Sequence, residues 1–84
     1  MKDNIEKGEV TGIDGWEFTK HQAPNGFRYE IFNEQKLSVG WMDERGALQI
    51  RIGINNRWDF TGHYFKNNPL QAARFIFLTT QKAQ

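Results

Sequence analysis

The sequence predicts an α+β fold: a five-stranded antiparallel β-meander with one C-terminal helix packed on the apolar sheet face. Two observations lead to this prediction. Apolar and polar residues alternate through residues 36–65, as they do in antiparallel strands that have one face in a core and the other in water. Asn68-Pro69 then opens an apolar segment in the way that helices begin, because Asn caps free amides and Pro lacks only a donor that the first turn leaves unused.

The 84 residues form one domain, 1–84, with three parts. Residues 1–15 are an acidic, partly flexible N-terminal segment that three glycines interrupt, with at most a short strand at 9–13. The β-meander occupies 16–65 and the C-terminal helix 68–82. The expected strands of the meander are 16–22, 27–32, 36–42, 47–54 and 58–65.

Turn residues separate these strands. Pro24-Asn25-Gly26 supplies the fixed and the positive φ angles of a tight turn. Residues 33–35 form the next bend. Asp43-Glu44-Arg45-Gly46 places Asp first and Gly last, as a type I turn prefers.

Directly opposed residues of an antiparallel pair share a face, so the loop lengths determine which residues reach the core. A two-residue loop at 55–56 would set Ile52 opposite Asp59 and place a charge in the core. A three-residue loop at 55–57 avoids this and is the expected arrangement. The predicted opposed pairs are Ile54–Trp58, Ile52–Phe60, Trp41–Leu48, Val39–Ile50, Ile31–Leu37 and Phe18–Ile31.

The C-terminal segment is apolar around its whole circumference when it is drawn as a helix. Leu70, Ala73 and Phe77 form the stripe that would cover the sheet, whereas Phe75 and Leu78 point away from it. These two side chains are candidates for contacts in a homodimer. The alternative is a sixth strand at 74–80, because Phe, Ile and Thr favour strands.

The polar face of the meander is the expected binding face. Mid-strand glycines at 40 and 53, forked arginine donors and aromatic side chains on the wet side distinguish it from a random polar surface. An ordinary solvated face, with Glu30 paired to Arg51, is the alternative interpretation. The predicted binding residues are Arg28, Phe32, Gln49, Arg51, Thr61, His63 and Phe65.

Catalytic and metal-binding signatures are missing from the sequence. It has no cysteine, two histidines and no phosphate-binding or nucleophile motif, so we expect no enzyme, no metal and no cofactor. His63 and Asp59 lie four residues apart on one expected strand, roughly 13 Å, which is too far for a hydrogen bond. No apolar run approaches a membrane span, and the N-terminus does not resemble a signal peptide, so a cytoplasmic protein is expected.

Two binding functions therefore compete. A partner protein is favoured, with this chain as its inhibitor or regulator, because the net charge is +1 and aromatic residues make up 14% of the chain. The alternative is single-stranded nucleic acid, with Phe32 and Phe65 stacking on bases and arginines following the phosphates. Short chains rich in Asn and aromatic residues are typical of phage or plasmid accessory proteins, which agrees with either function.

Overall fold

The computed structural model describes residues 5–52, 57–66 and 68–82. They form six strands and one helix, so the predicted α+β meander with a C-terminal helix is confirmed, with one strand more than expected. The elements are β1 (Ile5–Glu9), β2 (Glu17–Ala23), β3 (Gly26–Phe32), β4 (Ser38–Met42), β5 (Ala47–Ile52), β6 (Arg57–Tyr64) and α1 (Pro69–Lys82).

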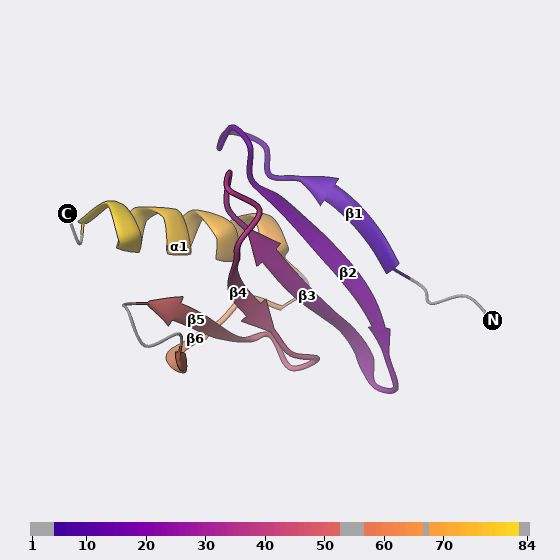
Figure 1. The fold of residues 1–84 in the computed structure, drawn as a ribbon. Helices are drawn as coiled ribbons and strands as arrows, with labels where there is room; N and C mark the ends of the chain where they lie inside the picture. The colour runs from indigo at the N-terminus through magenta and orange to yellow at the C-terminus, as the bar shows by residue number, and fades with distance from the viewer. Residues whose placement is uncertain (1–4, 53–56, 67, 83–84) are drawn as a thin grey trace.

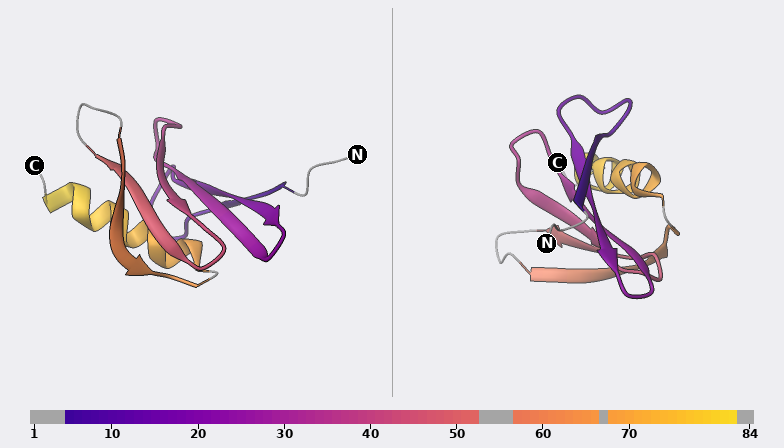
Figure 2. Two further views of the ribbon diagram at one scale, coloured as in Figure 1. Left: turned by 90° about the horizontal axis from the view of Figure 1, so that it is seen from below. Right: turned by 90° about the vertical axis from the view of Figure 1, so that its right-hand side faces the viewer.

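The six strands form one sheet in chain order, and each pairs with the next in antiparallel orientation. The helix α1 lies across one face of the sheet, where it contacts β3, β4 and β5 (Figures 1 and 2). No other described element covers the opposite face. The molecule therefore has a helix-covered face, which contains the core, and an uncovered face, which is available for other contacts.

The cap at Asn68 explains why the C-terminal segment is a helix. The Asn68 side-chain oxygen accepts a hydrogen bond from the Gln71 amide at 3.1 Å, and its carbonyl accepts one from the Ala72 amide at 3.2 Å. The sixth-strand alternative for 74–80 is thus wrong. The buried stripe also differs from the predicted one, because Ala72, Ala73 and Ile76 face the sheet while Leu70 is 38% exposed.

The N-terminal segment contributes more structure than the sequence indicated. Its strand is β1, at Ile5–Glu9, so the expected strand at 9–13 is wrong. The chain between β1 and β2 instead buries Val10, Ile13 and Trp16 in the core. The Trp16 indole meets the Phe77 ring of the helix edge to face, with ring centroids 5.6 Å apart. These contacts anchor the β1–β2 connection to α1.

The register between β2 and β3 is the predicted one. Phe18 lies opposite Ile31, and Ala23 lies opposite Gly26 across the two-residue turn. All expected face assignments in these two strands follow from this register. The Pro24-Asn25 turn sets it directly, because a short turn leaves the strands no freedom to slip.

The predicted register of β4 is wrong by one residue on its β5 side and by three on its β3 side. Gly40 lies opposite both Ile31 and Ile50, and Met42 lies opposite Leu48. Neither Val39–Ile50 nor Trp41–Leu48 nor Ile31–Leu37 is a pair. The helix is the physical cause: a Cβ atom at Gly40 would collide with Ile76 Cδ1, so the strand turns its glycine toward α1 and Trp41 away from it.

The predicted register of β6 is also wrong. Arg57 lies opposite Ile52, Trp58 opposite Arg51 and Phe60 opposite Gln49, which replaces the predicted pair Ile52–Phe60. The predicted partner of Trp58, Ile54, lies outside the described residues. Trp58 is consequently 38% exposed and Phe60 52% exposed. The strand β6 is at the sheet edge, and its His63, near the end of the strand, meets the Phe75 ring of α1. Trp58 and Phe60 face away from α1, because they lie opposite Arg51 and Gln49 on the uncovered face.

Candidate binding face

The uncovered face is organised by a row of directly opposed residues that crosses all six strands. Opposed residues in antiparallel strands point to the same side of a sheet. The row consists of Lys7, Thr19, Glu30, Trp41, Gln49 and Phe60. Because residues two apart on a strand also share a face, the row identifies the whole surface.

We call this surface the open face. It combines aromatic rings, charged groups and hydrogen-bonding side chains, and it lies opposite α1. It includes Lys7, Glu17, Thr19, His21, Arg28, Glu30, Phe32, Trp41, Gln49, Arg51, Trp58 and Phe60.

Two cations, one on the open face and one beside it, form ion pairs with neighbouring carboxylates. Arg28 Nε lies 3.0 Å from Glu44 Oε1, and a hydrogen bond from the Arg28 guanidinium holds the pKa of Glu44 below its ordinary value. Lys36 Nζ, beside the face, lies 3.0 Å from Glu17 Oε2. Each of these charges is therefore balanced locally.

Arg51 has a different role. Its guanidinium donates a hydrogen bond of 2.7 Å to the Ser38 carbonyl and lies 5.1 Å from the centroid of the Trp58 ring. These contacts hold the Trp58 indole beside β5 by a cation–π interaction. The expected pairing of Arg51 with Glu30 is not among the ion pairs of the described residues.

Two hollows lie on the open face. The larger has a volume of about 320 Å³ and is lined by Glu30, Trp41, Gln49 and Trp58. The second, of about 180 Å³, lies toward the β1 edge and is lined by Lys7, Glu17, Thr19, Phe32 and Lys36. The larger hollow places two indoles and a carboxylate around one space.

The structure distributes the predicted binding residues over three places. Four of them, Arg28, Phe32, Gln49 and Arg51, share the open face. Thr61 lies where the β5–β6 register shifts, next to Gly62 with its φ of +84°, and its hydroxyl donates a hydrogen bond to the Leu48 carbonyl.

The other two predicted binding residues lie against the helix. The His63 ring centroid is 4.7 Å from that of Phe75, and the Phe65 centroid is 5.7 Å from it. Phe75, a candidate for dimer contacts, is therefore half-buried in this aromatic cluster. The other dimer candidate, Leu78, is 56% exposed.

Sequence reasoning missed Trp41, Trp58 and Phe60 as surface residues because alternation assigned them to the core. The sequence of β4 does contain a signal that Trp41 faces outward. Reading Gly40 and Met42 as the inward pair would have turned Trp41 outward, and a glycine facing a helix permits close packing. No comparable signal marks β6, because its register depends on a connection that the sequence leaves open.

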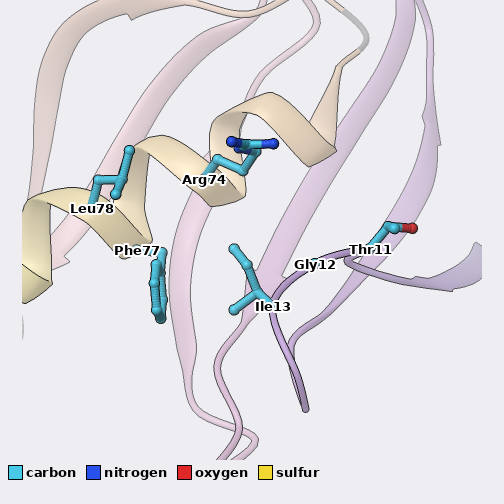
Figure 3. Close-up of a pocket in the computed structure, with 6 residues that line it drawn as sticks. All are labelled: Thr11, Gly12, Ile13, Arg74, Phe77 and Leu78. Carbon is cyan, nitrogen blue, oxygen red and sulfur yellow. The ribbon is translucent and has the colours of Figure 1, made fainter.

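A third hollow lies on the other side of the molecule, between the β1–β2 connection and α1 (Figure 3). Its volume is about 190 Å³, and the Ile13 and Phe77 side chains line it together. Thr11, Gly12, Arg74 and Leu78 complete its lining. It is smaller than the Trp41–Trp58 hollow, and it lacks the exposed indoles and the several charged groups of the open face, so the open face is the stronger candidate for recognition.

Comparison with protein-family models, with curated proteins and with solved structures found no match. Within the described ranges, no three His, Asp or Glu side chains are grouped as a metal site would need. The one helix described, α1, is too short to cross a membrane.

Proposed function

We propose that this chain is a non-enzymatic recognition module that binds a partner protein through its open face, as an inhibitor or regulator of that partner. One observation carries the proposal: the face opposite the helix exposes Trp58 and Phe60 beside Arg51, next to a hollow lined by two indoles. Trp and Arg are the residues on which protein interfaces most often depend, because each supplies a large contact area together with hydrogen bonds.

The charge pattern favours a protein over a polyanion. Arg28 and Lys36 already form ion pairs with carboxylates of this chain, and Glu17 and Glu30 lie on the same face. A nucleic-acid surface would need several cations free to approach phosphates. A mixed face of aromatic, acidic and basic groups instead suits the mixed surface of a folded protein or peptide.

Capture from host lysate, followed by an affinity measurement with the partner it identifies, tests the proposal. Trp58→Ala removes the exposed indole of the open face, whereas Leu78→Ala removes an exposed side chain on the helix side. We expect Trp58→Ala to lower the affinity for the partner about 30-fold or more, as truncation of a central interface tryptophan does. Leu78→Ala should leave the affinity unchanged. The opposite pattern would assign recognition to the helix side and contradict the proposal.

Single-stranded nucleic acid is the second candidate, and the exposed rings of β6 favour it. Phe60 and Tyr64 are 52% and 55% exposed, and their centroids lie 5.6 Å apart. Exposed rings on a sheet can stack on bases. Fluorescence anisotropy with a labelled oligothymidylate would show binding that weakens steeply as salt rises. Absence of binding at low salt would eliminate this candidate.

A further inference from the structure

The hollow between Trp41 and Trp58 has a chemistry that selects one class of ligand. Four neighbouring strands build it, because Glu30, Trp41, Gln49 and Trp58 come from β3, β4, β5 and β6 in turn. Trp41 lies directly opposite both Glu30 and Gln49. The hollow therefore contains aromatic surface and one carboxylate, with an amide beside them.

The Glu30 carboxylate indicates most clearly which ligand the hollow would accept. Its side chain is only 28% exposed, yet it accepts no hydrogen bond from any protein group within the described ranges. Its ionic neighbour is His21, whose Nε2 lies 3.9 Å from Glu30 Oε1, beyond hydrogen-bond distance. That imidazole also lies 2.9 Å from the Thr19 hydroxyl and balances Glu30 only when it is protonated.

The nearby arginines do not supply the missing charge. Arg28 is paired with Glu44, and Arg51 donates to the Ser38 carbonyl. Neither of them lines the hollow. A partly buried carboxylate without a hydrogen-bond donor favours a ligand that brings both a donor and a positive charge.

The two indoles also favour a positively charged ligand. The face of an aromatic ring carries negative charge density and attracts cations, most strongly in tryptophan. A carboxylate accepts hydrogen bonds and donates none, so a neutral apolar side chain would leave Glu30 unsatisfied. A phosphate would be repelled by it. Charge complementarity thus identifies the occupant as a cation attached to an apolar stem.

We propose that this hollow receives a lysine or arginine side chain of a partner protein, with its charge on Glu30 and its stem against Trp41 and Trp58. This inference rests on the proposed protein-binding function and specifies the chemistry of the partner. Both cationic side chains share the features required, an apolar stem and hydrogen-bond donors on a positive group.

Titration with small probes tests the site without the partner. The probes are N-acetyl-lysine methylamide and N-acetyl-arginine methylamide, and the neutral control is N-acetyl-norleucine methylamide. The readout is the set of three indole N–H signals in ¹H–¹⁵N NMR spectra. Trp16 is an internal reference, because its Nε1–H is hydrogen-bonded to Glu34 at 2.8 Å and its side chain is buried in the core.

We expect one or both cationic probes to shift the Trp41 and Trp58 signals in a saturable way while Trp16 stays in place. Glu30→Gln keeps the shape of the side chain and removes its charge, and it should lower the affinity for the cationic probe about tenfold. The matched control is Glu17→Gln, which removes a carboxylate of the same face that is paired with Lys36 and lies outside the larger hollow. It should leave binding unchanged.

Equal shifts with the norleucine probe, or equal affinity in Glu30→Gln, would overturn the inference. So would cationic probes that leave both open-face indoles unmoved. Trp58→Ala provides a second variant, since this exposed side chain can be removed without opening the core. Probe affinity that survives Trp58→Ala would also contradict the site.

The outcomes separate this inference from the proposed function. A partner that is captured through the open face and is insensitive to Glu30→Gln would leave the function standing and refute the cation site. Cationic probes that bind in the hollow, in a chain whose partner is lost through Leu78→Ala alone, would support the site and refute the function.

Discussion

The two halves of the sheet differ in how closely their register follows from the sequence. In β2 and β3 each opposed pair is the predicted one, whereas in β4 and β6 the predicted faces are inverted. The β2–β3 hairpin has a two-residue turn. The β3–β4 and β5–β6 pairs contain shifts in register, between Ile31 and Phe32 and between Ala47 and Gln49.

This difference has a functional consequence. The regular half, β2 and β3, contributes Phe32 and otherwise polar and charged groups to the open face. The irregular half, β4 to β6, contributes Trp41, Trp58 and Phe60 beside Gln49 and Arg51. The aromatic part of the candidate site exists because the registers of β4 and β6 turn these residues outward.

The largest expected effect on stability comes from comparing a buried and an exposed residue on the two faces of the irregular half. Leu48→Ala should lower the free energy of unfolding by about 2–5 kcal/mol, because Leu48 is fully buried and its loss leaves a cavity. Phe60→Ala should cost at most about 1 kcal/mol, since Phe60 is 52% exposed. Urea denaturation measures both. A severe loss in Phe60→Ala would support the register in which Phe60 faces the core.

A smaller effect is expected at Gly40, where the helix meets the sheet. Gly40→Ala should cost about 1–3 kcal/mol, because the new Cβ would overlap Ile76 Cδ1 and lie 3.5 Å from two atoms of Ile31. Ile76→Val removes the colliding methyl group and is the matched second change. A double-mutant cycle should show that Ile76→Val costs less in Gly40→Ala than in the parent chain. Strictly additive effects would mean that the two residues do not touch.

The sequence predicted the fold class, the terminal helix with its cap at Asn68 and the register of β2 and β3, because each depends on local signals. It could not predict the faces of β4 and β6. In β4, alternation allows either Val39 and Trp41 or Gly40 and Met42 to face the core. Only the close packing of Ile76 against Gly40 decides between these two arrangements. In β6, the register depends on the length of the connection after Ile52.

Four of the seven predicted binding residues reach the open face. Arg28 and Phe32 do so because they lie on the regular half. Gln49 and Arg51 do so because they lie on β5, whose inward residues were predicted correctly.

The smallest expected effect concerns the turn at 43–46, where local sequence and structure agree. The Gly46 amide donates to the Asp43 carbonyl at 2.9 Å, and the amides of Arg45 and Ala47 donate to Asp43 Oδ1 at 2.9 and 3.0 Å. Burial raises the pKa of the Asp43 carboxyl, but these bonds and the Arg45 guanidinium outweigh it and hold the pKa below its ordinary value.

A carboxyl with a lowered pKa in the folded state stabilises the fold above its unfolded pKa of about 3.9, and this contribution is lost as pH falls through the folded value. Asp43→Asn should therefore cost about 1 kcal/mol at pH 7, and the cost should shrink as the pH falls below about 4. Urea denaturation at pH 7 and pH 3 measures the difference. Asp59→Asn is the control: Asp59 is exposed, and its removal should change stability little at either pH. A cost for Asp43→Asn that does not vary with pH would show that the geometry of the turn, rather than the ionised carboxylate, stabilises this hairpin.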